Sequence, residues 1–321
     1  MNSKLDMKKT YLILTLIVAL AGWSQQDPQI AFYQQHLQLY NPAATGVEGY
    51  TSINTTLRNQ WQGLEDSPRV QAFTLSFPGR EKRLSYGAMI MVDKTFVERQ
   101  TRLFATFSYR LPLGNSNSLY LGVQGGGNNV NLNFNGINLA HQDDSELDNF
   151  SRFYPNVGVG AYIQLKKVYL ALSAPLLFSH KKNKEADAIN PTPADDMHVY
   201  FSGGVRLPAF ARDWEYIAST LMRWVPNAPS TTVFNAGLAY QKSELTLAYH
   251  HNGSLGGNLL IDTGGVLSMG YAYQFPTQSL ISKLNSGNHE IILRIRLDNK
   301  SATPPDEIIA DDEQNPISFN N

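Results

Sequence analysis

Hydrophobic and polar residues alternate with a period of two along most of the chain after residue 50. The alternation is clearest in 84–92, 103–111, 153–163 and 291–297. Successive side chains of a β-strand point to opposite faces of the sheet, so each segment has one apolar face and one mixed, often charged face. The pattern predicts strands rather than helices, whose hydrophobic period is 3.6.

Alternation alone fits two architectures. A soluble β-sandwich would bury the apolar faces, whereas a transmembrane β-barrel would turn them toward lipid and keep the polar faces inside. Three features favour the barrel: segments of about nine to eleven residues, aromatic residues at segment ends, and links that alternate between short and long. The aromatic residues are Tyr109, Trp224, Tyr240, Tyr249, Tyr273 and Phe275. We therefore expect an all-β protein, a transmembrane antiparallel β-barrel, with a soluble periplasmic β-sandwich as the alternative.

The number of strands follows from the segments and from closure. The obvious segments are 50–58, 69–77, 84–93, 101–111, 118–127, 152–164, 167–175, 198–206, 215–224, 231–240, 243–250, 265–275 and 289–297. A closed barrel with both chain ends in the periplasm needs an even number of antiparallel strands. Residues 255–261 supply the missing strand, and 262–265 then form a tight turn. We expect about 14 strands.

The first strand should run outward from a periplasmic N-terminus. Short periplasmic turns are then expected at 112–117, 165–166 and 241–242, and longer outer loops at 128–151 and 176–197. Closure is required because an open sheet edge in hydrocarbon leaves amide groups without partners. Glycines within strands, such as those at 122, 158 and 160, suit the close approach of interior groups to the wall.

The two ends of the chain differ from the strands. Lys8-Lys9, the apolar stretch 10–22, and the small residues Gly22 and Ser24 before Gln25 predict a cleaved signal peptide over 1–24. An uncleaved N-terminal membrane anchor is the alternative. We expect 25–49 to be a periplasmic or lumen-plugging segment, 50–297 the barrel, and 298–321 a flexible acidic tail.

The composition excludes several classes of site and partner. The formal net charge is −1, so no bulk electrostatic attraction to nucleic acid is expected. The chain has no cysteine, which excludes disulfides, thiolate metal sites and a lipidated cysteine. The predicted signal peptide and strands that would cross a bilayer together predict residence in a Gram-negative outer membrane, with the lipid bilayer as a partner.

Several short motifs stand out along the chain by their order and spacing. The candidate residues are Asn41, Pro42 and Gly46 in a turn-forming segment, Arg58, Asn59, Gln60, Trp61 and Gly63 near the end of the first strand, Pro68, and Gly287, His289 and Glu290 around the start of the last strand. Further matches lie at 108–111, 155–160, 173–176 and 270–273. In their order and spacing these residues make the mature chain resemble the PorP/SprF family of type IX secretion. The acidic tail departs from the usual family ending.

The resemblance implies a non-catalytic outer-membrane barrel. Its expected partners are the type IX translocon, periplasmic components of the secretion or gliding machinery, and one secreted surface protein with a C-terminal sorting domain. The barrel would serve export or cell-surface attachment of that protein. No catalytic residue, cofactor or metal ion is expected.

The residues themselves leave two roles open for each motif. Arg58 and Trp61 could form a buried polar knot with the N-terminal segment, or anchor a strand end with Trp61 at the membrane interface. His289 and Glu290 could form an ion pair that closes a loop, or contact a partner. Arg294 and Arg296 alternate with apolar residues and should face the lumen.

No enzymatic signature is apparent. There is neither a nucleophile elbow nor a zinc-binding helix motif. Adjacent His250 and His251 would point to opposite faces of a strand and could not share a metal ion. Acidic clusters around 143–148 and 195–196 could bind calcium loosely, although solvated loop charge is the simpler interpretation.

Two functions follow. The first is a barrel that binds a secreted partner through the loops 128–151 and 176–197, the lumen wall, or the segment 25–49. The second is a passive channel for small solutes, since a barrel of this size can hold a lumen.

Overall fold

The computed structural model describes residues 29–61, 67–79, 83–114, 116–133, 149–178, 197–226, 229–251, 253–277 and 287–297. The predicted signal peptide, Gly63, the acidic tail and most of the two longest links lie outside these residues. Among the described residues, no helix is long and apolar enough to span a membrane.

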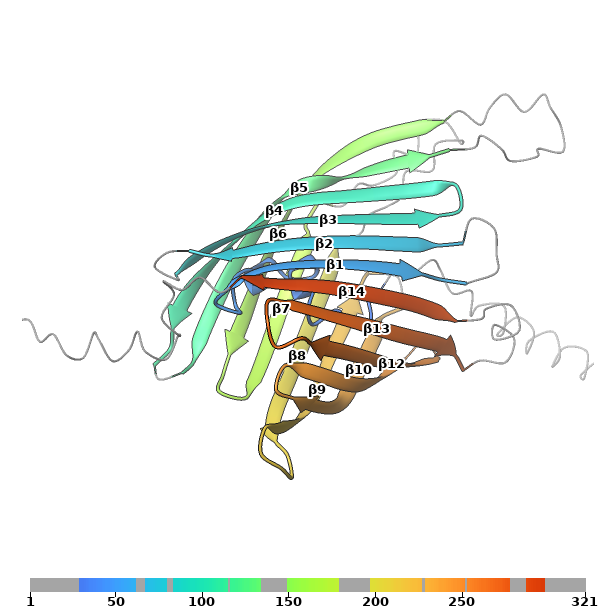
Figure 1. The fold of residues 1–321 in the computed structure, drawn as a ribbon. Coiled ribbons are helices and arrows are strands. Elements are labelled where there is room, and N and C mark those ends of the chain that lie inside the picture. The colour runs from blue at the N-terminus through green and yellow to red at the C-terminus, as the bar shows by residue number, and fades with distance from the viewer. Residues whose placement is uncertain are drawn as a thin grey trace, which may run out of the picture.

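Fourteen antiparallel strands form one closed barrel, which confirms the predicted fold (Figure 1). The strands are β1 (Thr51–Asn59), β2 (Arg69–Pro78), β3 (Leu84–Thr95), β4 (Glu98–Pro112), β5 (Ser118–Leu132), β6 (Phe150–Gln164), β7 (Val168–Leu176), β8 (His198–Pro208), β9 (Trp214–Trp224), β10 (Thr231–Tyr240), β11 (Ser243–His250), β12 (Ser254–Asp262), β13 (Leu267–Pro276) and β14 (Asn288–Leu297). Each strand pairs with its neighbours in sequence, and β1 pairs with β14 to close the wall.

The links between strands divide between the two ends of the barrel. Those at the end where β14 finishes are all short, and the longest, 133–149 and 177–197, are at the other end. Following the rule for outer-membrane barrels, we name these the periplasmic end and the outer end. Two outer links, 96–97 and 251–253, are as short as the periplasmic turns, so the outer rim is uneven.

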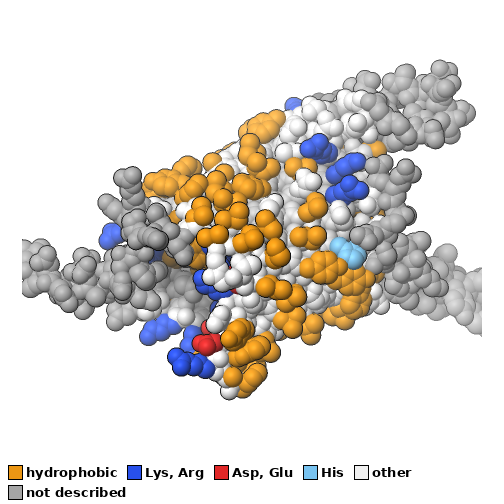
Figure 2. All heavy atoms as spheres, in the orientation of Figure 1, with side chains coloured by type: hydrophobic (Ala, Val, Ile, Leu, Met, Phe, Trp, Pro, Cys, Tyr) orange, Lys and Arg blue, Asp and Glu red, His pale blue; other side chains and the backbone are white. Residues whose placement is uncertain are grey.

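The apolar row of each strand faces outward. In β4, Leu103 and Phe107 are exposed, while Phe104 and Thr106 between them are buried inside the barrel. Each of the described strands carries exposed hydrophobic side chains, and Figure 2 shows the apolar band that they form on one face. A soluble sandwich would bury these side chains and is therefore excluded, because this much apolar surface is stable only in lipid.

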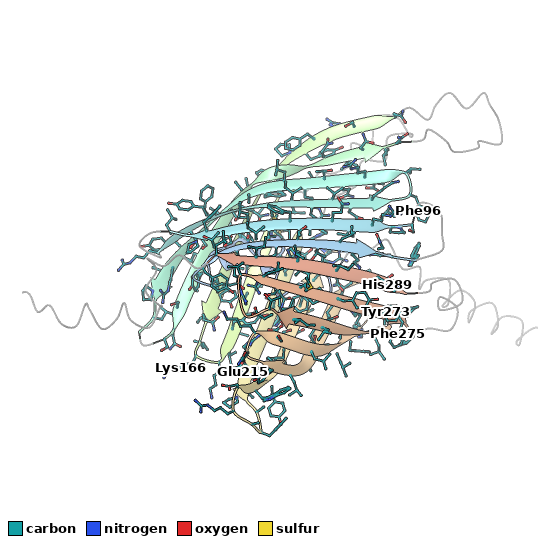
Figure 3. All side chains as sticks on the ribbon, viewed as in Figure 1. Phe96, Lys166, Glu215, Tyr273, Phe275 and His289 are labelled. Carbon is teal, nitrogen blue, oxygen red and sulfur yellow. The ribbon has the colours of Figure 1, made fainter. Side chains whose placement is uncertain are left out.

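Aromatic side chains border the band at both ends. Tyr249, Phe275 and Trp224 lie toward the outer end, and Tyr109 and Tyr240 toward the periplasmic end, all exposed. Figure 3 labels Phe275 at the outer end, together with Tyr273, His289 and Phe96, the last in the turn between β3 and β4. Rings with an apolar body and a polar edge favour the membrane–water interface, as the sequence predicted for girdle positions.

Candidate functional site: the occupied lumen

The N-terminal segment occupies the interior of the barrel. At the outer end, the Gln29 amide donates to the Thr231 hydroxyl at 2.7 Å. At the periplasmic end, the Gly46 nitrogen donates to the Ser76 hydroxyl at 2.7 Å. Between them, two short 3-10 helices, η1 (Leu37–Leu39) and η2 (Pro42–Ala44), cross the lumen (Figure 1). Residues 29–50, which we call the plug, therefore run from the outer end of the lumen to the start of β1.

A buried carboxylate holds the outer part of the plug. Glu290 accepts hydrogen bonds from the nitrogens of Ala31 at 2.8 Å and Phe32 at 3.1 Å, and pairs with Arg58 at 3.2 Å. The side chains of Arg58 and Glu290 are 5% and 1% exposed, and Arg58 also bonds Gln274. The two charges satisfy each other where water is excluded, so neither is left uncompensated. Because Arg58 and Glu290 are register partners on β1 and β14, they also fasten the seam of the barrel.

His36 occupies the middle of the lumen without access to solvent. Its ring nitrogens lie 2.9 Å from the Thr56 hydroxyl and 3.2 Å from the Thr74 hydroxyl. Burial, with a further contribution from the nearby Arg294 charge, lowers the pKa of His36 to about 3. The imidazole is therefore neutral at physiological pH, with one ring nitrogen as donor and the other as acceptor.

The turn predicted from the Asn-Pro dipeptide packs against a notch in the wall. The Asn41 side chain caps η2 by accepting from the Ala43 nitrogen at 2.8 Å, and donates to the Ala161 carbonyl at 3.0 Å. Opposite it, Gly122 and Gly160 are register partners on β5 and β6. A Cβ atom on either glycine would collide with this turn, so the wall accommodates η2 only because both positions lack side chains.

Motifs far apart in the sequence meet on the plug. The Ser173 hydroxyl donates to the Tyr40 carbonyl at 2.7 Å, and Ser108 donates to the Thr45 carbonyl. Gly270 lies so close to the Phe32 ring that a Cβ atom would overlap it. Gly46 has a φ of 75°, as its expected turn position required. The short motifs at 108–111, 155–160, 173–176 and 270–273 thus share a structural role, which is to contact the plug, and the motif at 41–46 is part of the plug itself.

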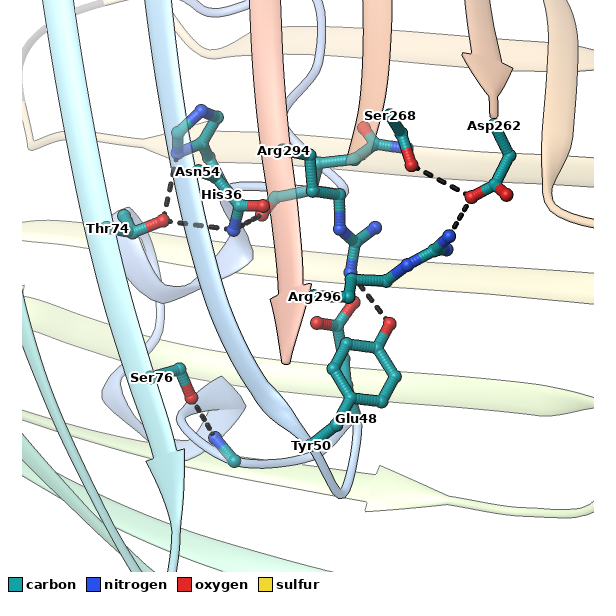
Figure 4. Close-up of polar contacts among 12 residues, drawn as sticks. His36, Glu48, Tyr50, Asn54, Thr74, Ser76, Asp262, Ser268, Arg294 and Arg296 are labelled. Atoms are coloured by element: carbon teal, nitrogen blue, oxygen red, sulfur yellow. Dashed lines mark hydrogen bonds and ion pairs between the residues drawn. The ribbon is translucent and has the colours of Figure 1, made fainter. Parts of the chain in front are cut away.

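A charged network holds the periplasmic end of the plug (Figure 4). Arg294 pairs with Glu48 and donates to the Tyr50 hydroxyl at 2.9 Å. Arg296 pairs with Asp262, which also accepts from Ser268 at 2.9 Å. Both arginines face the lumen, as the alternation predicted. Burial and the adjacent Glu48 carboxylate raise the pKa of Tyr50 to about 12, so its hydroxyl stays protonated.

Two cavities border the periplasmic half of the plug. One of about 120 Å³ borders Gln35 and Ser52, and one of about 240 Å³ borders Lys167, Arg206 and Glu244. On the outer side, the cavity beside Tyr40 measures only about 20 Å³. One water needs roughly 10–15 Å³, so this outer space holds little more than a single water.

The remaining sequence candidates lie outside the lumen. The Gln60 nitrogen donates to the Pro68 carbonyl at 2.9 Å across the link from β1 to β2, and Asn59 ends β1 on its outward row. Trp61 has a φ of 52°, is half-buried, and its ring centroid lies 6.2 Å from that of Phe96. Arg58 and Trp61 are therefore separated, the first inside the barrel and the second at the outer rim.

His289 and Glu290 do not pair with each other, which corrects one of the two roles considered for them. Adjacent strand positions point to opposite faces, so Glu290 faces the lumen while His289 faces outward. The His289 ring bonds the Tyr271 hydroxyl at 2.6 Å and packs on Tyr273 with centroids 5.0 Å apart. Gly287, with a φ of 108°, sits against the same Tyr273 ring.

Sequence reasoning missed most of the side chains that hold the plug. His36, Gln38, Thr56 and Thr106 carry no motif signal. Gln38 donates to the Thr106 hydroxyl at 2.9 Å, and Thr45 donates to the same hydroxyl at 2.8 Å. The available signal was a polar residue at every second position of β1, namely Ser52, Asn54, Thr56 and Arg58, which marks a wall facing polar groups.

The charged groups that hold the plug, Glu290 and Arg294 among them, are paired with an opposite charge, and Glu290 also accepts from two backbone nitrogens. At the centre of the lumen, Tyr33 and His36 are closed to solvent. Within the described ranges, no group of three or more histidine and acidic side chains could hold a metal ion. The acidic clusters around 143–148 and 195–196 lie outside those ranges.

A closed antiparallel barrel with an apolar outer band and an occupied lumen defines an integral membrane barrel of the outer-membrane type. The family model of the type IX secretion system membrane protein PorP/SprF matches residues 23–295, and the chain belongs to this family. No curated protein matches the chain.

Solved barrels resemble the chain only at the level of general shape. Omp33 of Acinetobacter baumannii is 5% identical, with 77% of this chain and 98% of that chain covered and a TM-score of 0.46. A mutant of the Rh. blastica porin is 7% identical, with 77% and 99% covered and a TM-score of 0.34.

Proposed function

We propose that this barrel binds one secreted protein, through that protein's C-terminal sorting domain, and serves its export or its attachment at the cell surface. Family membership supports a place in the type IX secretion or gliding machinery. The observation that carries the proposal is the plug, which is fixed at both ends and in the middle by buried polar contacts. A barrel that keeps its lumen occupied is suited to holding a partner on its rim rather than to passing solutes.

The outer rim is the proposed partner surface. Strands β4, β5 and β6 each have 15 residues, whereas β11 has 8. At roughly 3.3 Å per residue, the seven additional residues make each long strand about 23 Å longer than β11, so the wall is taller on this side of the barrel. The links 133–149 and 177–197 connect β5 to β6 and β7 to β8 at the outer end, on the side of this raised wall. The long strands are labelled in Figure 1.

The periplasmic end is the proposed contact for the translocon and its periplasmic components. Lys166 and Lys167 form a turn there, and Arg206 bridges Glu215 and Glu244 at the same end. Lys166 and Glu215 project from this end in Figure 3. The acidic tail 298–321 follows β14 from the periplasmic end, which would place it within reach of the same components.

Affinity capture from detergent-solubilised outer membranes tests the proposal. A tagged barrel should retain one large surface protein together with translocon components, and cells lacking the barrel should fail to display that protein. Normal display in the deletion strain would contradict the proposal. Mass spectrometry of the captured barrel also tests cleavage, with Gln25 expected as the first residue.

Variants with shortened links would show which end of the barrel binds the secreted partner. Replacing 136–146 or 182–193 with a short Gly-Ser link should abolish retention of the secreted partner while translocon components stay bound. The matched control shortens the periplasmic link 209–213, which should leave the secreted partner in place. Loss of the partner in the control alone would assign it to the periplasmic end instead.

A further inference from the structure

The larger cavity at the periplasmic end of the lumen reaches the surface beside two lysines. It measures about 240 Å³, and its lining includes Lys166 and Lys167, which are both exposed in the turn between β6 and β7. Figure 3 labels Lys166 and Glu215 at this end of the barrel. We call this cavity, together with the two lysines at its edge, the basic pocket.

The two lysines carry the uncompensated charge of the basic pocket. Its two arginines are paired, since Arg206 bridges Glu215 and Glu244 and Arg294 pairs with Glu48. Among the described residues, neither lysine is paired with an acidic side chain. A cleft with a surplus of one sign attracts charges of the other sign. The basic pocket therefore favours a ligand that carries carboxylates.

The surplus of positive charge extends over the other turns at this end. Arg83, Arg212 and Lys242 are exposed in the turns that follow β2, β8 and β10. Within the described parts of the periplasmic turns, Asp213 is the one acidic residue. The basic pocket thus lies in a basic surface, and an acidic segment that approaches it meets little repulsion.

An acidic segment of opposite charge follows the last strand. Residues 298–321 contain six acidic residues and one lysine. Five of the acidic residues lie within 306–313, which we call the acidic segment. Its centre is apolar, because Ile308 and Ile309 separate the two acidic groups. The lining of the basic pocket offers a matching surface in the rings of Tyr162 and Tyr169, which stack with centroids 5.2 Å apart.

The acidic segment is long enough to reach the basic pocket. In the barrel, β7 lies seven strands from β14 and hence on the opposite side of the mouth. A wall of fourteen strands, spaced about 4.8 Å apart and tilted by about 40°, is about 28 Å across. At about 3.3 Å per residue, 306 and 313 lie up to about 30 and 53 Å from the end of β14.

We propose that the acidic segment 306–313 docks on the basic pocket of its own barrel and covers the periplasmic mouth of the lumen. Its carboxylates pair with Lys166 and Lys167, and its isoleucines pack on the tyrosine rings of the lining. Single exposed ion pairs are weak. The tether through β14 compensates for this weakness, because it holds the segment at an effective concentration on the order of millimolar. The docking needs no secreted partner and is independent of the proposed function.

Carbodiimide cross-linking of the full barrel in detergent tests where the acidic segment binds. The reagent joins a lysine Nζ to a carboxylate as an amide with no spacer, and mass spectrometry of the digest identifies the joined residues. We expect Lys166 or Lys167 to be joined to the acidic segment. Mixing isotope-labelled and unlabelled barrels should give few mixed products. Cross-links of the acidic segment only to Lys82 or Lys242, or mainly between labelled and unlabelled copies, would overturn the proposal.

A label on the acidic segment measures how strongly it docks. The chain has no cysteine, so Ala310→Cys provides a single site for a fluorophore whose anisotropy distinguishes docked from free segments. In Lys166→Gln with Lys167→Gln, the ratio of docked to free segment should fall roughly tenfold, because each exposed ion pair contributes up to about a fivefold effect. Lys166→Arg with Lys167→Arg keeps both charges and should keep the ratio.

The matched control changes two basic residues of the same end that do not line the basic pocket. Arg83→Gln with Arg212→Gln should leave the ratio of docked to free segment within about twofold of the native value, since only the general field is reduced. An equal fall in the control and in the lysine variant, or a free label in the native barrel, would overturn the proposal. Heat-modifiable electrophoretic mobility checks folding, and the single variants Lys166→Gln and Lys167→Gln replace the double variant if it does not fold.

Discussion

A single carboxylate, that of Glu290, joins three parts of the molecule. It accepts from two plug nitrogens, pairs with Arg58, and lies where the first and last strands meet. The sequence alone singled out both residues but left their roles open. The two residues are 232 positions apart and meet only because the barrel closes, so no local sequence pattern could predict their pairing.

Removing one member of this pair should cost more than removing both. Glu290→Gln leaves the Arg58 charge buried without a counter-charge, and we expect a loss of about 3–5 kcal/mol in the free energy of unfolding. The variant Arg58→Met with Glu290→Met should lose less than the sum of the two single changes, because no isolated charge remains. Urea unfolding in lipid bilayers measures the native barrel, the single variants Arg58→Met and Glu290→Met, the double variant, and Glu290→Gln. Additive losses would mean that the two side chains are not coupled.

His36 should make plug docking sensitive to acid. Its pKa is about 3 when docked and about 6.5 in an exposed chain, so the undocked state binds more protons between these values. Stability of the docked plug should be complete above pH 6.5 and fall as the pH decreases, by about 1.4 kcal/mol per unit. Protease cleavage within 29–50 should therefore be faster at pH 5 than at pH 7.5. In His36→Gln the rate should be nearly the same at both values, and an unchanged pH dependence in this variant would assign the effect to another group.

At the scale of elements, the strands were largely predictable and their contacts with the plug were not. Period-two alternation arises because one face of each strand contacts lipid. It therefore predicted where the strands lie and which of their residues face outward. The strand with the least clear alternation, β12, was predicted only because a closed barrel needs an even number of strands. The extensions of β4 and β5 beyond 101–111 and 118–127 were not predicted, because polar residues outside the membrane do not alternate with apolar ones.

The contact between η2 and the wall at Gly122 and Gly160 can be tested by substitution. Gly122→Ala places a methyl group against the backbone of η2, which cannot rotate away as a side chain can. We expect a loss of about 1–3 kcal/mol from overpacking, together with greater protease access to residues 29–50. Gly125→Ala on the same strand is the matched control, because its Cβ atom would meet open space. Equal behaviour of the two variants would show that η2 does not press on the wall.

At the scale of the whole molecule, the plug runs through the lumen from the outer end to the periplasmic end, opposite to the direction of β1. Residue 29 lies at the outer end of the lumen, the chain descends to residue 50, and β1 then ascends. The sequence could suggest a segment in the lumen but not its direction, because direction is fixed by contacts with β10, β14 and β2. The lumen and the strands therefore form one folded unit around the plug.

This arrangement determines whether the barrel conducts. With the plug in place, Tyr33 and His36 fill the middle of the lumen without access to solvent, so the native barrel in planar bilayers should carry little steady current. Deleting residues 29–46 removes the contacts to Thr231, Glu290, Thr56 and Ser76 and should open a lumen of ordinary porin width, giving stable steps of current. A barrel lacking only the acidic tail 298–321 is the matched control and should stay silent. Heat-modifiable mobility establishes that each form is folded before it is measured. Large, steady currents from the native barrel would instead favour a passive channel, because a fixed plug and an open pore cannot occupy the same lumen.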